Sequence, residues 1–252
     1  MRFGAMALAV AMFFPMAGRS AELPGPLAAA RAQITTADYR LSGRLVRVDA
    51  SGTRTSDGIS IKAHWFPGGL RLLLEVNSPV EARVHALIEV RPGGATTIQI
   101  AHPGDAAPRV LPFDQWSAGP LGGEFSYEDF VGSYYFWTGQ KDMGAAKFGA
   151  RMCDLLTSTP GPEDKTHYAE VKSWLDAGSS FPVYVEKTLK GPGTVKEFTS
   201  FGLRRTEGVW SASQVQAKLR GQSGSTLLII EHGTPRAHLG SKDFSSEQLT
   251  RF

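Results

Sequence analysis

The sequence has few of the residues and motifs that usually indicate chemistry. It contains one cysteine, Cys153, in 252 residues, so no disulfide can form within the chain. Its six histidines are scattered, and no HExxH motif or paired-cysteine spacing that would hold zinc accompanies them. Glycine-rich phosphate loops and a G-x-S-x-G nucleophile motif are also missing. We therefore expect a protein without a metal or cofactor that is not an enzyme.

Neither sign of charge predominates. The chain has 27 Lys and Arg against 24 Asp and Glu, a formal net charge of +3. A nearly neutral chain without a Lys/Arg-rich run is not typical of nucleic-acid-binding proteins, so we expect no nucleic acid partner. No long polar linker divides the sequence, which favours one domain. We also expect a monomer.

Long apolar runs are also rare, and the clearest one lies at the start of the chain. Residues 3–17 are almost wholly apolar, follow Met1-Arg2 and precede small residues up to Ala21. This is the pattern of a secretory signal peptide. The run is shorter than the ~20 apolar residues of a membrane-spanning helix. We expect residues 1–20 to be a signal peptide cleaved near Ser20 or Ala21, which lowers the net charge to +1 by removing two arginines, and residues 21–252 to form the exported domain.

Extended segments are abundant. Between Thr166 and His232, five segments rich in β-branched and aromatic residues follow one another. Short polar breaks separate them, at residues 176–180, 191–193, 207–208 and 221–224. Because these breaks are too short for a crossover helix, successive strands should pair as an antiparallel meander. We expect Trp174 and Trp210 to be buried in it.

The first half of the chain predicts more strands. A short helix from about Pro26 to Gln33 precedes a strand over residues 38–49, and Pro-Gly-Gly turns at 67–69 and 92–94 predict two hairpins. The total is roughly ten or eleven strands, and a sheet that wide curls. The predicted fold class is mainly β (α+β): a single large curled antiparallel sheet, or incomplete β-barrel, with short helices.

The most aromatic part of the chain, Leu111 to Trp137, interrupts the strands. Its aromatic residues are Phe113, Trp116, Phe125, Tyr127, Phe130, Tyr134, Tyr135, Phe136 and Trp137. Within it, residues 126–129 have the S-x-x-D form of a capping box. An alternative makes Glu128 and Asp129 an acid/base or cation-binding pair. Adjacent helical residues point about 100° apart, which favours the capping interpretation.

Four stretches resemble the LolA-like outer membrane lipoprotein-sorting proteins. They are FSYEDF at 125–130, Tyr168 with Trp174-Leu175-Asp176, Gly208-Val209-Trp210, and Ser225-Thr226-Leu227-Leu228-Ile229 followed by the closing KDFSSEQL. Their order and spacing cover most of the chain after about residue 35. The resemblance implies a periplasmic protein whose concave sheet face is closed by helices and a loop around an apolar cavity. It also implies a lid over the concave face, which we assign to residues 111–137.

Two functions follow as hypotheses. The first is a non-catalytic periplasmic carrier or binding protein for lipoprotein acyl chains or another envelope lipid, because each CH₂ exposed to water costs about 0.8 kcal/mol. An inner- or outer-membrane protein would then be a partner. The alternative is an envelope protein-binding or sensor module, or an accessory of a lipid exporter, that uses its sheet edge or convex face.

The carrier hypothesis places the ligand between the concave sheet face and residues 113–137. The predicted cavity residues are Trp65, Leu72, Leu74, Ile88, Phe125, Phe130, Tyr134 and Phe136. A register shift of one residue would move every strand residue among them to the opposite face.

Overall fold

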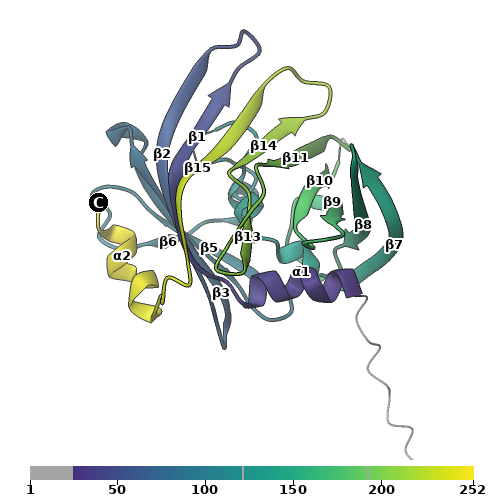
Figure 1. Cartoon of the computed structure of the whole chain (residues 1–252). Helices are drawn as coiled ribbons and strands as arrows, with labels where there is room; N and C mark the ends of the chain where they lie inside the picture. Colours follow the sequence, from purple (N-terminus) through teal and green to yellow (C-terminus); the bar gives the residue numbers. More distant parts are fainter. Residues whose placement is uncertain (1–24, 121, 192) are drawn as a thin grey trace, which may run out of the picture.

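Thirteen strands form one antiparallel sheet in the order β6-β5-β4-β3-β2-β1-β15-β14-β11-β10-β9-β8-β7. The computed structural model describes residues 25–120, 122–191 and 193–252, so the predicted signal peptide lies outside the described residues. The sheet curls around a hollow and is not closed into a barrel (Figure 1). The predicted fold class is confirmed.

The elements have the following bounds. The strands are β1 (Asp38–Val48), β2 (Arg54–Phe66), β3 (Gly69–Ser78), β4 (Val84–Val90), β5 (Thr96–Ala101), β6 (Arg109–Val110), β7 (Gly139–Phe148), β8 (Arg151–Thr159), β9 (Tyr168–Asp176), β10 (Pro182–Leu189), β11 (Val195–Phe201), β12 (Arg204–Thr206), β13 (Val209–Ser211), β14 (Gln214–Leu219) and β15 (Ser225–Pro235). The helices are α1 (Gly25–Thr35) and α2 (Ser246–Thr250), with 3₁₀ turns η1 (Val80–Ala82), η2 (Phe113–Gln115), η3 (Tyr127–Phe130), η4 (Ser133–Phe136) and η5 (Ser241–Phe244).

Strands β1 and β15 join the two halves of the sheet. They pair antiparallel, with Leu45 opposite Leu228, and a bulge lies at Ser42/Gly43. A Cβ at Gly43 would lie 1.9 Å from the Ile229 carbonyl oxygen, so the close approach of the two backbones requires glycine there. The first and last strands of the described chain therefore close against each other, and the middle of the chain provides the sheet edges.

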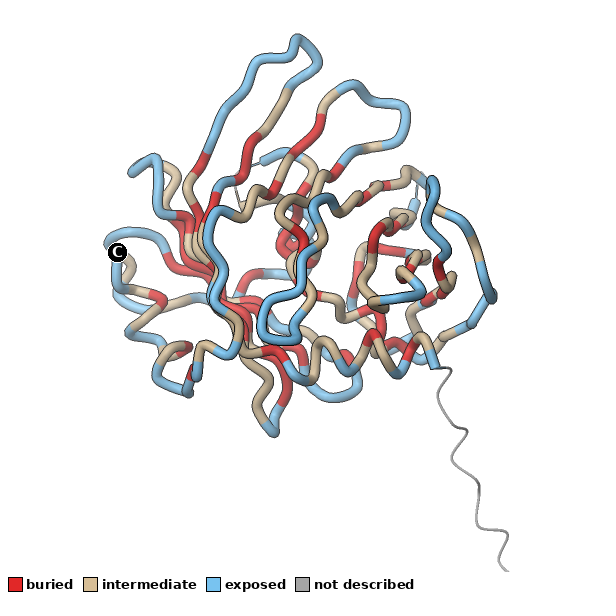
Figure 2. Tube along the Cα trace, in the orientation of Figure 1, coloured by how far each residue is buried: buried red, intermediate tan, exposed pale blue. Residues whose placement is uncertain are grey.

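The sheet is covered on both faces at β3–β5. The main core lies on the concave side, while a second cluster on the outer side packs Leu73 and Leu87 against Phe244 and Leu249 of the C-terminal segment. Figure 2 shows buried residues concentrated in this region, whereas the tips of the β1–β2 and β14–β15 hairpins are exposed. Double coverage explains why β3 is apolar on both faces rather than alternating.

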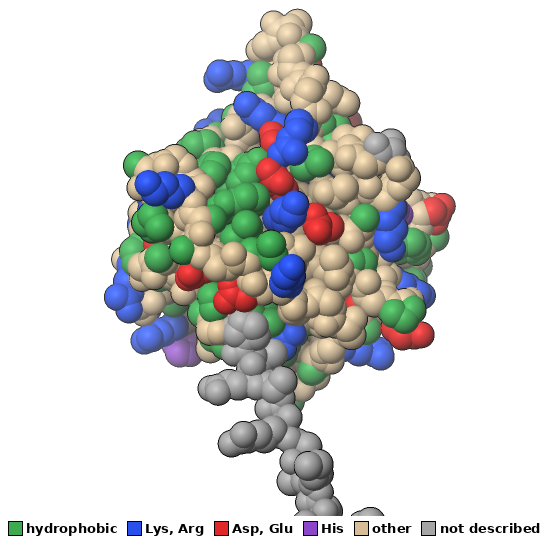
Figure 3. All heavy atoms as spheres, turned by 90° about the vertical axis from the view of Figure 1, so that its right-hand side faces the viewer, with side chains coloured by type: hydrophobic (Ala, Val, Ile, Leu, Met, Phe, Trp, Pro, Cys, Tyr) green, Lys and Arg blue, Asp and Glu red, His purple; other side chains and the backbone are tan. Residues whose placement is uncertain are grey.

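Strands β7 and β8 are absent from the sequence prediction, which therefore counted too few strands. β7 is an edge strand, it is mostly exposed, and it contains a bulge between Asp142 and Ala145. An exposed edge strand needs no apolar alternation, so the usual sequence signal is missing. Figure 3, seen from the side of β7 and β8, shows hydrophobic side chains gathered beside a band of charged ones.

The meander is confirmed for β9, β10, β11, β14 and β15, with one correction. β11 pairs directly with β14, and the intervening β12 and β13 form a separate two-stranded hairpin. The predicted burial of Trp174 and Trp210 is wrong, because both are half-buried. Alternation buries Ser173 and Leu175 and leaves Trp174 against Tyr184, with ring centroids 5.0 Å apart.

Candidate ligand cavity

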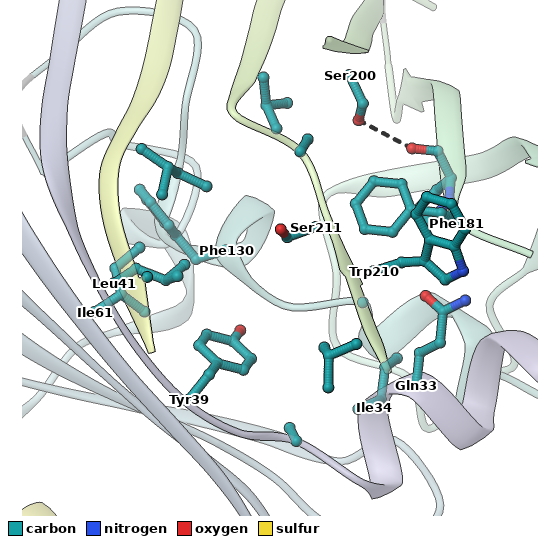
Figure 4. A pocket seen from close by; sticks show the side chains of 18 of the residues that line it. Gln33, Ile34, Tyr39, Leu41, Ile61, Phe130, Phe181, Ser200, Trp210 and Ser211 are labelled. Atoms are coloured by element: carbon teal, nitrogen blue, oxygen red, sulfur yellow. Dashed lines mark hydrogen bonds between the residues drawn. The ribbon is translucent and has the colours of Figure 1, made fainter. Parts of the chain in front are cut away.

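A cavity of about 1100 Å³ occupies the concave side of the sheet. Its walls come from α1, from η3 and η4, from strands on both halves of the sheet and from the β12–β13 hairpin. Figure 4 shows Leu41, Ile61, Phe130 and Tyr39 on one side and Trp210 with Phe181 on the other. This volume lies just above the ~300–1,000 Å³ typical of ligand pockets.

Helix α1 lies across the cavity and is hydrogen-bonded to the β9–β10 turn and to η4. Gln33 Nε2 donates hydrogen bonds to the carbonyl oxygens of Ser179 (3.2 Å) and Ser180 (2.9 Å) in the β9–β10 turn. Arg31 Nε donates to the carbonyl oxygen of Tyr135 in η4 at 2.8 Å. With Ile34 pointing into the cavity, α1 is one cover of the hollow (Figure 4).

The β12–β13 hairpin is the other cover. Residues from both of its strands line the cavity, with Trp210 lying beside Gln33 and Phe181 (Figure 4). Among the described strands, β12 and β13 pair only with each other. The hairpin is mostly exposed. A segment with few backbone partners opens at lower free energy than the main sheet.

The aromatic segment is fixed to the sheet by Asp129. One oxygen of this fully buried carboxylate accepts from Lys187 Nζ at 2.8 Å, and the other accepts from Lys196 Nζ at 3.0 Å. The hydroxyl of Tyr168 adds a hydrogen bond at 2.7 Å. The Ser126 N–H also donates to Asp129, at 2.8 Å, so the predicted capping contact is present.

Electrostatics at Asp129 favour its ionised form. Burial alone would raise its pKa, but the ammonium groups of Lys187 and Lys196 and the hydrogen bonds outweigh burial and lower the pKa of Asp129 well below its usual range. The Lys187 ammonium also lies over the Phe198 ring, 4.7 Å from its centroid. The cluster is a buried ionic link between η3, β10 and β11.

Glu128 makes a second link with different partners. Its carboxylate accepts from Thr166 Oγ1 at 3.0 Å and lies 2.9 Å from His167 Nδ1. Glu128 and Asp129 therefore do not converge on one atom, which argues against the acid/base alternative. Two buried links therefore tie the segment to the sheet, where it forms one wall of the cavity beside α1 and the β12–β13 hairpin. A role of residues 111–137 as a lid stays a prediction.

The structure divides the eight predicted cavity residues into two groups. Leu72, Phe125, Phe130 and Tyr134 line the cavity. Leu74 and Ile88 are fully buried in the core that includes Trp116 and Trp137, and Trp65 stacks on Phe136 with centroids 5.7 Å apart. These four residues do not line the cavity, because aromatic side chains fill the concave space over this part of the sheet. Ligand contact by any of the eight stays a prediction.

Four further residues that line the cavity were not predicted from the sequence: Gln33 of α1, Arg204 and Trp210 of the β12–β13 hairpin, and Arg236, which follows β15. The Glu207-Gly208 turn is compatible with two structures, a separate hairpin and a turn within the meander. The interpretation as a meander turn was the wrong one.

Alternative chemistry has little support in the described residues. No group of three His, Cys, Asp or Glu side chains there is placed to hold a metal ion. Glu231, which precedes His232 in β15, pairs with Arg44 at 2.7 Å. Cys153 is buried, and burial raises the pKa of its thiol, which disfavours the nucleophilic thiolate.

Comparison with known proteins places the chain in a family. A family model described as "-like: Uncharacterized protein" matches residues 111–251. The chain belongs to that family. No curated protein sequence matches the chain. Across residues 25–120, 122–191 and 193–252, every helix is too short or too polar to cross a membrane.

Solved structures show the fold. An outer membrane lipoprotein-sorting protein domain from Vibrio parahaemolyticus superposes with a TM-score of 0.78 at 19% identity, over 89% of this chain and 98% of that one. A DUF1329 family protein from Desulfovibrio piger gives 0.78 at 15% identity (88% and 96% covered), and a LolA superfamily protein from Nitrosomonas europaea gives 0.67 at 14% (89% and 97%). The predicted LolA-like fold is confirmed.

Proposed function

We propose that this protein is a non-catalytic periplasmic carrier or binding protein. It holds the acyl chains of a lipoprotein or of another envelope lipid in the concave cavity. The observation that carries the proposal is a cavity of about 1100 Å³ on the concave face of a LolA-like sheet. Predicted export through residues 1–20 supports a periplasmic location.

The lining of the cavity suits hydrocarbon. Leu41, Ile61, Leu72, Phe130 and Ile230 present apolar side chains to the hollow from both halves of the fold. Transfer of an acyl chain from water into an apolar cavity is favourable by about 0.8 kcal/mol for every CH₂ that is buried. A preformed apolar space of this size therefore gives a strong driving force for uptake. The cavity needs no catalytic group for this purpose.

The covers suit reversible loading. The aromatic wall is fixed by two buried polar links, whereas the β12–β13 hairpin pairs only with itself among the described strands. A ligand therefore enters by displacement of the hairpin while the core stays packed. The similar structure from Vibrio parahaemolyticus is that of an outer membrane lipoprotein-sorting protein domain, and this likeness is consistent with an acyl cargo here.

The test is binding of a fluorescent fatty-acyl probe to wild-type protein and to Leu41→Trp. Leu41 is half-buried and points into the hollow, so the larger ring fills space that the chain would occupy (Figure 4). Val110→Trp is the matched control, because Val110 is 70% exposed and outside the cavity. We expect loss of probe binding only in Leu41→Trp, with thermal midpoints that stay close to wild type. A folded wild type that binds no acyl probe would contradict the proposal.

A further inference from the structure

The acidic side chains that line the cavity already have partners inside the protein. Asp129 is bound by two lysines, and Glu231 pairs with Arg44 at 2.7 Å. The two Asp38 oxygens accept the backbone N–H groups of residues 238 and 239, each at 3.0 Å. These carboxylates are thus satisfied before any ligand arrives.

Two cavity-lining arginines differ from them. Arg204 opens β12 and Arg236 follows β15, and both are exposed at the cavity. The arginines that pair with carboxylates in the described chain are Arg40, Arg44, Arg47, Arg71, Arg151 and Arg220. Arg204 and Arg236 are not among them, so neither guanidinium forms an ion pair with a carboxylate of the residues that the structure describes.

The two guanidinium groups lie along one seam. Arg204 Nη2 of the hairpin lies 3.9 Å from the position that a Cβ would take at Gly233 of β15. Conversely, Arg236 Nη2 lies 3.9 Å from the equivalent position at Gly208, in the turn of the hairpin. Each arginine thus reaches the element opposite its own, and together they border the gap between the movable cover and the sheet.

We propose that Arg204 and Arg236 bind the anionic headgroup of the amphiphile whose chains occupy the cavity. The proposal rests on the proposed carrier function and adds the ligand's charge and orientation: acidic head at the rim, hydrocarbon inside. A guanidinium presents planar paired donors that match a carboxylate or phosphate. A headgroup held by both residues also bridges the hairpin to β15, so binding closes the cover over the chains.

The experiment uses purified, delipidated protein and three probes with one acyl chain in common: palmitate, 1-palmitoyl lysophosphatidate and neutral monopalmitoylglycerol. Dissociation constants are measured at low and high salt. We expect the anionic probes to bind about tenfold more tightly than the neutral one at low salt, and the difference to shrink at high salt because salt screens exposed charges. Preference for phosphate assigns a phospholipid headgroup, and preference for carboxylate assigns a fatty acid; either supports the proposal.

Variants locate the effect. R204Q/R236Q should weaken binding of the anionic probes about tenfold and leave the neutral probe unchanged. R205Q is the matched control, because Arg205 lies on the same hairpin, donates to the Gly208 carbonyl oxygen and does not line the cavity. Equal binding of all three probes, unaffected by R204Q/R236Q, overturns this inference while the carrier function stands. Failure of every probe to bind overturns both.

Discussion

Replacing Asp129 by Asn tests how the cavity wall is held. The substitution leaves the Lys187 and Lys196 ammonium groups, with side chains only 4% and 9% exposed, without their shared counterion. Removing one partner of a buried ion pair costs about 3–5 kcal/mol. For a domain of this size about 2–4 °C of thermal midpoint is lost per kcal/mol, so the expected drop is on the order of 10 °C.

Thermal and urea denaturation provide the assay. Asp114→Asn is the control, because Asp114 is an exposed carboxylate in the same segment and should change the midpoint little. Changing Lys187 and Lys196 to Met together with Asp129→Asn removes all three charges and should recover part of the loss. The reasoning is refuted if Asp129→Asn has the wild-type midpoint, or if the triple variant is no more stable than the single one.

The remaining predictions concern pH, the hairpin and export. The pKa of Asp129 is lower in the folded protein than in the unfolded chain, where it is about 4. Its contribution to stability is therefore complete above about pH 4 and is lost as the pH falls toward the folded pKa. The free energy of unfolding, measured between about pH 2 and pH 6, should thus fall less with acid in Asp129→Asn than in wild type. Trp210→Ala should cost about 1 kcal/mol, against the ~3–5 kcal/mol of a fully buried aromatic, yet speed probe release in stopped-flow measurements; an unchanged release rate would show that the hairpin is not the cover. Intact-mass measurement should place the mature N-terminus near Ala21, and retention of Met1 would contradict export by cleavage.

The sequence predicts the parts of this fold that local patterns specify. Short polar breaks and β-branched segments suffice for the antiparallel order of β9, β10 and β11, and Pro-Gly-Gly suffices for the β2–β3 hairpin. At Gly69 φ is 117°, and an added Cβ would lie 2.1 Å from the Val90 carbonyl oxygen. The turn therefore requires glycine at this position. β7 escapes prediction because an exposed edge needs no apolar face.

The site depends on long-range contacts that a linear pattern does not show. Nothing in S-x-x-D indicates that Asp129 meets two lysines from residues 187 and 196, so a strong tertiary link resembles an ordinary cap. Aromatic residues at 113–137 predict a segment that covers the concave face of the sheet, but whether they fill or leave a hollow is decided by packing. Hence Leu72 lines the cavity while Leu74, on the same strand face, is covered by the core.

The most direct test of the carrier account is native mass spectrometry of the exported protein purified from envelope-containing cells. The account predicts a non-covalent adduct with the mass of an acyl lipid on wild-type protein, released on collisional activation and absent from Leu41→Trp. Wild-type protein that carries no adduct, or an adduct equally abundant on Leu41→Trp, would contradict the claim that the concave cavity holds lipid.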